Sequence, residues 1–227
     1  MKFPLDQFNK GIDSEEIVSI WGEMGVGKTT LALQIALNNI QGGDSVYYFY
    51  SKPRLPFEKI ESLLPTTDPN SLKKLKTILI KNFNDLYRIV LDLEINILKY
   101  KKEKQDYPKL IIIDSLTDLY RLDLYKDKKE KNLILNYKLN HLLGTLAHIH
   151  NKFSVDILVV NEISYLRLED HSHEIQSGGK VMRYWFPFSI KIARSEIMNK
   201  RRLYLYKNSQ IQFERLATLS EKGFLTM

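Results

Sequence analysis

Apolar residues along the chain follow two different rhythms, and each predicts one kind of secondary structure. Short continuous apolar runs bounded by turn formers are typical of strands that are buried on both faces of a sheet. Such runs occupy residues 16–21, 45–50, 77–80, 109–114 and 156–162. Between them, apolar residues recur at spacings of three and four, as on one face of a helix. The helices predicted in this way occupy residues 30–37, 57–64, 82–98 and 132–152. Strands that alternate with helices predict an α/β fold with a mostly parallel central sheet flanked by helices.

The last third of the chain has a different pattern. Apolar and polar residues alternate over residues 189–194, 202–207 and 211–213. A turn at residues 198–200 would join the first two runs into an antiparallel hairpin that extends the parallel sheet. Residues 163–180 lack a hydrophobic pattern, and we expect them to form a long loop of the kind that is functional or disordered. The length of 227 residues suits one domain of this class.

One stretch between the first predicted strand and the first predicted helix has the spacing of a phosphate-binding loop. It reads Gly-x-x-x-x-Gly-Lys-Thr and runs from Gly22 to Thr29. Glycines let the backbone N–H groups converge on phosphate, the lysine places a charge between the β- and γ-phosphates, and the hydroxyl ligates Mg²⁺. The helix N-terminus adds its partial positive charge. The residues expected to bind ATP are Gly22, Glu23, Met24, Gly25, Val26, Gly27, Lys28, Thr29 and Thr30.

An acidic residue is expected beside this loop. Residues 110–113 are apolar, and Asp114 ends the run. A carboxylate at the carboxyl end of a central parallel strand can hold Mg²⁺ through water. Taken alone, such a run is also typical of a strand that ends in an ordinary turn. With the loop upstream, we predict that Thr29 and Asp114 bind the metal, that Asp114 belongs to the nucleotide site, and that ATP and Mg²⁺ are the cofactors.

Composition restricts the class of protein and its partners. No apolar run approaches the length of about 20 residues that crosses a bilayer, and the first residues lack the apolar core of a signal peptide, so no membrane partner is expected. The absence of cysteine excludes disulfides and thiolate metal sites and fits a cytoplasmic protein. The net charge is +7, and residues 180–202 hold seven basic residues against one acid, a local surplus of 7 − 1 = +6. This surplus permits an anionic partner.

The order and spacing of these motifs resemble those of the RecA-like recombinase ATPases, specifically the archaeal RadA group and its short paralogues. The likeness covers nearly the whole chain. Beyond the phosphate loop it includes the Asp114 strand, the passage from Lys138 to Asn161, Gly178-Gly179, Arg201-Arg202-Leu203 and the segment from Glu221 to Phe224. The resemblance implies a RecA-like P-loop NTPase core as a single domain over residues 1–227. In contrast to full recombinases, the sequence shows no match to their helical N-terminal DNA-binding domain or to their aromatic filament-linking motif, and we expect both to be missing.

Two positions depart from the family pattern in ways that concern hydrolysis. In the family, a glutamate just beyond the second strand polarises the attacking water, and Lys52 takes that place here. The family glutamine that senses the γ-phosphate is replaced by Glu162. Because a lysine does not act as a carboxylate base at neutral pH, we expect weak or slow ATP hydrolysis, with Lys28 and Glu162 as the candidate catalytic residues. Two roles for Glu162 stay open: orienting water or repelling the nucleotide.

The family binds single-stranded DNA through two loops, which correspond by position to residues 122–131 and 164–180. Cations and a tyrosine in these segments suit sequence-independent contact with a single strand. Acidic residues are interspersed among them, as on an ordinary solvated surface. The candidate DNA-binding residues are Lys126, Lys128, Lys129, Lys131, Arg167, Lys180 and Arg183.

Two functions from different classes are compatible with these residues. The first is a RadA-paralogue protein that binds ATP and single-stranded DNA and modulates a recombinase or another DNA-repair protein, alone or as a homo-oligomer. The second is a nucleotide-gated assembly or signalling module of the clock-like ATPase branch, which needs ATP binding but no DNA. Charge distribution discriminates between them, because DNA binding predicts that Lys180, Arg183 and the lysines of residues 126–131 share a face with the two loops.

Overall fold

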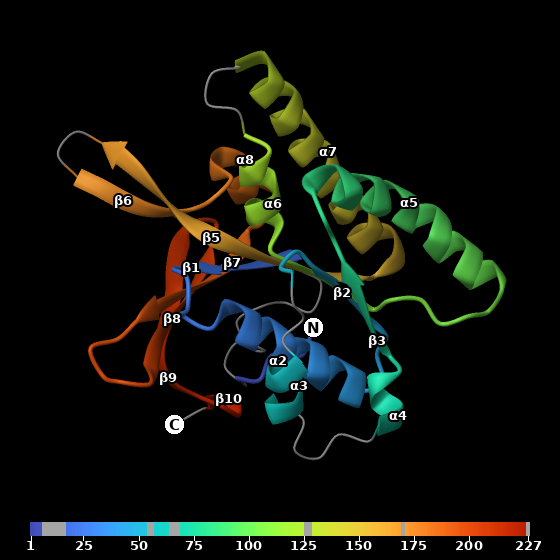
Figure 1. The fold of residues 1–227 in the computed structure, drawn as a ribbon, viewed down its shortest axis with the longest axis horizontal. Helices are drawn as coiled ribbons and strands as arrows, with labels where there is room; N and C mark the ends of the chain where they lie inside the picture. Colours follow the sequence, from blue (N-terminus) through green and yellow to red (C-terminus); the bar gives the residue numbers. More distant parts are fainter. Residues whose placement is uncertain (6–16, 54–56, 64–68, 125–128, 169–170, 226–227) are drawn as a thin grey trace.

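A β-sheet with helices on both faces forms the centre of the fold (Figure 1). The computed structural model describes residues 1–5, 17–53, 57–63, 69–124, 129–168 and 171–225. The strands are β1 (Ile17–Gly22), β2 (Val46–Tyr50), β3 (Leu75–Leu79), β4 (Leu110–Asp114), β5 (Asp156–Leu168), β6 (His171–Gln176), β7 (Phe188–Arg194), β8 (Lys200–Lys207), β9 (Gln210–Ser220) and β10 (Gly223–Leu225). The helices are α2 (Lys28–Gln41), α3 (Phe57–Leu63), α4 (Pro69–Leu72), α5 (Phe83–Lys102), α6 (Leu116–Leu122), α7 (Lys129–Phe153) and α8 (Gly179–Trp185).

Parallel pairing joins most of the sheet, in the order β7-β1-β5-β4-β2-β3. From β7 onwards the strands pair antiparallel, through β8 and β9 to β10. The predicted α/β fold, with a mostly parallel sheet and an antiparallel C-terminal extension, is confirmed. In the register of the parallel strands, Gly22 of β1 lies opposite Glu162 of β5, and Asp114 of β4 lies opposite Tyr50 of β2. The carboxyl ends of these strands therefore share one edge of the sheet.

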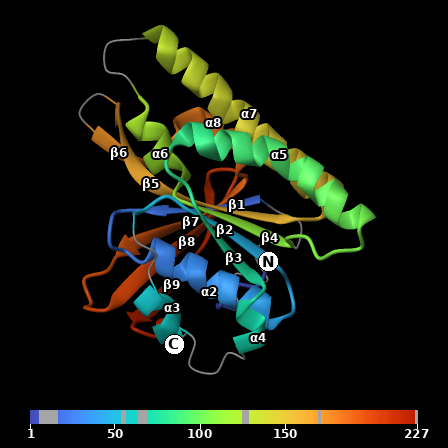
Figure 2. The same cartoon turned by 45° about the vertical axis from the view of Figure 1, so that its right-hand side comes forward.

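Two apolar cores, one on each face, hold the helices against the sheet (Figure 2). On one face, Leu31 and Ile35 of α2 are buried together with Ile20 of β1. On the other face, α5 and α7 pack side by side, and the predicted leucine stripe of α7 is buried. Within the described part of the chain, no helix has the length and apolar character needed to cross a membrane.

The segment from 163 to 180 is not the long loop that its sequence predicts. β5 continues through it to Leu168, β6 turns back antiparallel to β5, and α8 begins at Gly179. The hairpin of β5 and β6 projects from the body of the molecule (Figure 1). Because a projecting two-stranded ribbon has no face that must be buried in a core, its few apolar residues are interspersed with polar and charged ones and give no clear signal of a buried strand. A search for buried strands therefore misses it.

The last strand is tied to the first helix of the fold. Gln34 of α2 accepts a hydrogen bond from the N–H of Phe224 at 2.8 Å and donates one to the carbonyl of Phe224 at 3.2 Å. The ring of Phe224 also lies against the phosphate loop, because a Cβ added to Gly27 would meet it at 3.0 Å. Gly223 has a φ of +91°, and a Cβ there would collide with the amide of Gln34. β10 therefore borders the loop and depends on glycine to do so.

We predict that Gly223→Ala destabilises the protein more than Gly179→Ala does. Both glycines have positive φ, at which a side chain costs about 1–2 kcal/mol. A Cβ at Gly179 would meet nothing within 4 Å, whereas one at Gly223 displaces Gln34 from Phe224. The free energy of unfolding of Gly223→Ala should be lower than that of Gly179→Ala by about 1–3 kcal/mol, because two hydrogen bonds are broken. Urea unfolding followed by circular dichroism measures it, and equal losses in the two variants would contradict the prediction.

Candidate nucleotide-binding site

The loop between β1 and α2 has a backbone that requires glycine at its first position. Gly22 ends β1 with a φ of +151°, and a Cβ there would collide with the carbonyl oxygen of Ile192 in β7. Val26 is fully buried under the loop, and α2 begins at Lys28. The first turn of α2 contains no acidic residue, so its N–H groups and its partial positive charge can serve an anion. The strand, loop and helix predicted around residues 22–30 are therefore present.

Lys28 is buried and fully engaged. Its side chain is 6% exposed. Its ammonium group donates to the carbonyl oxygens of Gly22 and Glu23, at 2.9 and 2.8 Å, and to Oε2 of Glu162 at 2.8 Å. An ammonium group has three N–H donors, so all of them are in use. Because Glu162 lies opposite Gly22 in the register of β5 and β1, the two candidate catalytic residues form an ion pair.

Asp114 is fully buried at the end of β4. Tyr48 of β2 donates a hydrogen bond to its Oδ2 at 2.8 Å, while Oδ1 has no hydrogen-bond partner among the described residues. Burial raises the pKa of Asp114, and the nearby hydroxyls of Thr29 and Tyr48, followed by the charges of Lys52 and Lys28, act to lower it. Thr29, the other candidate metal ligand, is therefore close enough to influence this carboxylate.

These groups fit the magnesium ion and the triphosphate that the sequence implies. A buried carboxylate oxygen without a hydrogen-bond partner is unfavourable in a protein interior, and a cation bound beside it, directly or through water, removes that penalty. Thr29 and Asp114 together offer oxygen ligands only, which is the chemistry that Mg²⁺ prefers. The loop offers backbone N–H groups and the charge of Lys28 to the phosphates. The residues present are therefore of the kinds that ATP and Mg²⁺ need.

The end of β2 offers a cation where a catalytic carboxylate would be expected. Lys52 follows β2 and is exposed. The segment before it is fixed, because the N–H of Ser51 donates to the carbonyl of Asp114 at 2.8 Å and the hydroxyl of Ser51 accepts from the N–H of Ser115 at 2.9 Å. The charge of Lys52 lowers the pKa of Asp114, which places Lys52 within electrostatic range of the site. Lys52 can therefore attract a phosphate but cannot accept a proton from water at neutral pH.

Arg194, at the end of β7, contacts the phosphate loop and is missed by the sequence pattern. Its Nε lies 3.2 Å from Oε2 of Glu23, and its Nη2 donates to the carbonyl of Met24 at 3.2 Å. Arg194 and Glu23 are 62% and 44% exposed, so water weakens their attraction. The surplus of basic residues in 180–202 includes Arg194, but no local motif connects it with a loop 170 positions away. Arg194 braces the outer side of the loop.

A surface groove adjoins the loop. It is formed largely by the end of β9 and the turn that leads to β10, together with single residues of β10, α3 and the turn between β7 and β8. The groove is lined by Lys59, Asn199, Thr218, Leu219, Ser220, Glu221, Lys222 and Leu225. A Cβ added to Gly27 would meet Leu219 at 3.0 Å, so one lining residue of the groove lies against the phosphate loop. A mixed polar and apolar lining beside a phosphate-binding loop has the character of a site for a nucleobase and its sugar.

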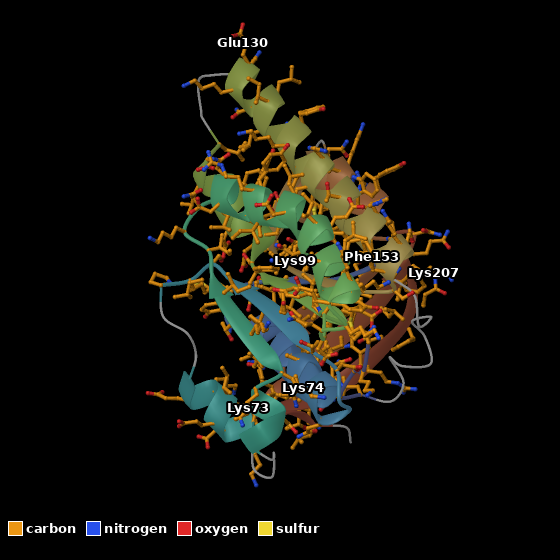
Figure 3. The ribbon with its side chains drawn as sticks, turned by 90° about the vertical axis from the view of Figure 1, so that its right-hand side faces the viewer. Lys73, Lys74, Lys99, Glu130, Phe153 and Lys207 are labelled. Atoms are coloured by element: carbon orange, nitrogen blue, oxygen red, sulfur yellow. The ribbon has the colours of Figure 1, made fainter. Side chains whose placement is uncertain are left out.

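The lysines of the first candidate DNA-binding segment lie at the start of α7. Lys129 and Lys131 are exposed there. This end of α7 projects beyond α5, with Glu130 near its tip (Figure 3). Lys126 and Lys128 lie outside the described residues. The described lysines of this segment are therefore on a projecting helix end and not in the nucleotide site.

The candidate residues of the second segment are on the hairpin and on α8. Arg167 belongs to the projecting part of β5. Lys180 and Arg183 are exposed on α8, which packs against both β6 and α7. Trp185 at the end of α8 donates a hydrogen bond to Asn140 of α7 at 2.7 Å. The structure thus joins the hairpin, α8 and α7 in one contiguous group of elements (Figure 1).

Comparison with known proteins agrees with this geometry. The sequence model of the Rad51 family matches residues 4–167. A protein of Methanococcus maripaludis named DNA repair and recombination protein RadB is 30% identical to this chain, over 89% of this chain and 87% of that protein. Proteins of the same name from Methanobrevibacter smithii and Methanocaldococcus jannaschii are 25% and 28% identical, over 95% and 88% of this chain and 89% and 84% of their own lengths.

We predict that Tyr48→Phe destabilises the protein by about 1–3 kcal/mol at neutral pH, because it leaves the buried Oδ2 of Asp114 without its donor. Tyr50→Phe is the matched control, since Tyr50 is also largely enclosed beside Asp114 but makes no hydrogen bond to it. The effect should depend on pH. The folded pKa of Asp114 is raised, so its contribution to stability is present below the unfolded pKa and is lost as pH rises through the folded pKa.

Loss of the Tyr48 hydrogen bond raises that folded pKa further, because the bond favours the charged form. Tyr48→Phe should therefore lose more stability at about pH 7 than at about pH 4, where Asp114 is closer to neutral. Urea unfolding at the two pH values measures the difference. A penalty that is equal for Tyr48→Phe and Tyr50→Phe, or one that shrinks as pH rises, would refute the role given to the Tyr48 hydroxyl.

Proposed function

The chain belongs to the Rad51 family, and on this premise we propose that it binds ATP with Mg²⁺ and acts on DNA in recombinational repair. The observation that carries the proposal is the meeting of Lys28, Thr29 and Asp114 beside a loop of phosphate-binding form. The name that its RadB relatives carry supports the role in repair and recombination.

Each part of the nucleotide has a proposed counterpart in the protein. The N–H groups of residues 22–30 surround the phosphates, and Lys28 contributes its charge. Thr29 and Asp114 hold Mg²⁺, which when bound neutralises charge on the β- and γ-phosphates. Tyr48 fixes the orientation of Asp114 through its hydrogen bond to Oδ2. The groove at the end of β9 is assigned to the base, because its lining residue Leu219 lies beside Gly27 of the phosphate loop.

Hydrolysis in this proposal is weak. Attack of water on the γ-phosphate is helped by a carboxylate that orients the water and takes up its proton. Lys52 at the end of β2 does not supply that carboxylate. Glu162 is a carboxylate in the site, but it is engaged in an ion pair with Lys28 at 2.8 Å. The site is therefore better equipped to hold a nucleotide than to turn it over.

Single-stranded DNA is the proposed second ligand. The exposed cations of α7 and α8 lie on elements that pack together with the β5–β6 hairpin. Tyr165 on this hairpin is 55% exposed and offers a ring for stacking with bases. We further propose that the chain works as a single RecA-like domain in the cytoplasm, as a monomer or a homo-oligomer, and modulates a recombinase or another repair protein.

One observation favours the second candidate function, a nucleotide-gated assembly module without DNA. Lys52 in place of a catalytic base suits a switch, because a switch depends on which nucleotide is bound more than on turnover. The packing of α8 against both α7 and β6 favours the DNA-binding function over this alternative, because it brings together elements that carry candidate DNA-binding residues. Oligonucleotide binding decides between the two.

We predict that Lys28→Ala weakens ATP binding by about tenfold or more, because a charge-assisted contact with phosphate contributes about 1.5–3 kcal/mol. Titration of a fluorescent ATP analogue in the presence of Mg²⁺ measures the affinity. Lys99→Ala, which removes the same charge from the exposed side of α5, is the control and should leave the affinity unchanged. Undiminished affinity in Lys28→Ala would rule out the loop as the nucleotide site.

Affinity for a fluorescent oligothymidine should fall steeply as salt rises, with the logarithmic slope changing by about 0.7 for each phosphate contact. The double variant Lys180→Ala/Arg183→Ala should flatten this slope by about 1–1.5, because two cations are lost. The matched control is Lys99→Ala/Lys102→Ala on α5, which changes the net charge equally at a distance from the hairpin. Absence of binding, or identical slopes in the two double variants, would shift the weight to the assembly module.

A further inference from the structure

Glu162 holds the phosphate-binding lysine in an ion pair that an incoming nucleotide has to compete with. The Lys28 and Glu162 side chains are 6% and 16% exposed, so water screens their interaction only slightly. The backbone of Glu162 is fixed in place, because it is in register opposite Gly22 and its N–H donates to Oγ1 of Thr117 at 3.1 Å. Its carboxylate therefore reaches Lys28 from a strand of the central sheet.

The phosphates of ATP depend on Lys28 to different degrees. The backbone N–H groups of a phosphate-binding loop hold the α- and β-phosphates, whereas the γ-phosphate relies on the lysine and on the metal. All three donors of Lys28 are in use, two with carbonyls and one with Glu162. A γ-phosphate gains this lysine only by displacing an oxygen from it, and it then lies close to the displaced carboxylate. ADP lacks the γ-phosphate and largely avoids both penalties.

The other cations near the loop do not compensate for this repulsion. Arg194 is 62% exposed, and its guanidinium group is already paired with Glu23. Lys52 is exposed beyond the end of β2. Water and salt screen the attraction that exposed cations exert on a phosphate far more than they screen the repulsion from a carboxylate that is mostly buried. Glu162 is therefore the side chain at the γ-position that opposes the attraction exerted by Lys28 and by a bound metal ion.

We infer that Glu162 is a specificity-determining residue that disfavours a γ-phosphate, so that the site binds ADP at least as tightly as ATP. The inference rests on the proposed function, since it requires that the loop of residues 22–30 binds adenine nucleotides. Beyond the proposed function, it states that ADP is bound at least as tightly as ATP and that the side chain of Glu162 causes this preference. It also assigns Glu162 to the second of the two roles that its position suggests, repulsion of the nucleotide.

Glu162→Gln tests the inference, because glutamine keeps the shape of the side chain and removes its charge. ATP affinity should rise by about tenfold or more, and ADP affinity should change by less than about threefold, since the removed repulsion acts mainly on the γ-phosphate. Isothermal titration with each nucleotide in Mg²⁺ gives the ratio of the two affinities. Glu94→Gln is the matched control. It removes the same charge from a carboxylate of α5 that pairs with Lys152 at 2.7 Å and lies outside the nucleotide site, so the ratio should stay constant.

The wild-type protein provides a second measurement that requires no variant. ADP bound as tightly as ATP, or more tightly, supports the inference even where Glu162→Gln fails to fold. Preference of the wild-type protein for ATP by more than about tenfold, or an unchanged ratio in a folded Glu162→Gln protein, would overturn the inference and leave the nucleotide site standing. Binding of neither nucleotide by either protein would overturn the proposed function together with it.

Discussion

Parallel pairing of β1, β5 and β4 is the constraint on which the candidate site depends. It places Gly22, Glu162 and Asp114 at the same edge of the sheet, although they lie far apart in the sequence. Apolar residues hold this arrangement, because the buried side chains of the three strands, such as Ile20, each contribute about 1.5–3 kcal/mol by their burial. A slip of one residue between β1 and β5 would turn Glu162 to the other face and break its ion pair with Lys28. The chemistry of the edge is therefore a consequence of how the core packs.

The two carboxylates at this edge, the buried Asp114 and the partly buried Glu162, have opposite expected effects on ligand binding. Asp114 has one oxygen without a hydrogen-bond partner among the described residues and a pKa raised by burial, so the protein gains stability when a cation binds beside it. Glu162, by contrast, already satisfies the charge of Lys28, so the protein loses a favourable contact when a phosphate takes that lysine. Under the proposed function, metal binding is favoured and γ-phosphate binding is opposed. This difference could not be read from the identity of the residues alone, because both are acids that directly follow a mostly apolar stretch of the sequence.

The features that were predicted from the sequence depend on local order, and the features that were missed depend on which strand ends meet. The phosphate loop, the strand that ends at Asp114 and the helix predicted over residues 82–98 each depend on residues within a few positions of one another, and the structure contains all three. The contact of Lys28 with Glu162 spans 134 positions. It exists because β1 lies beside β5, and the brace from Arg194 exists because β7 lies on the other side of β1. Hydrophobic periodicity carries no information about that order. The β5–β6 hairpin was missed for a different reason. It projects from the body of the molecule, so its strands do not need the continuous apolar pattern by which buried strands are predicted.

The two positions that depart from the family pattern, Lys52 and Glu162, would act on the same phosphate of the proposed nucleotide, so their effects have to be considered together. Catalysis needs a carboxylate that is free to take a proton from water. The nearby carboxylate here is released from Lys28 only when another anion replaces it, and that anion is the phosphate to be cleaved. Binding of the γ-phosphate to Lys28 would therefore coincide with the release of Glu162 from Lys28. The released carboxylate would then repel that phosphate. The exposed charge of Lys52 lessens this repulsion but adds no base. A site built in this way changes its internal contacts according to the nucleotide that it holds, and it does so without needing to turn that nucleotide over. Such a response suits the proposed function, in which the protein modulates a partner in DNA repair.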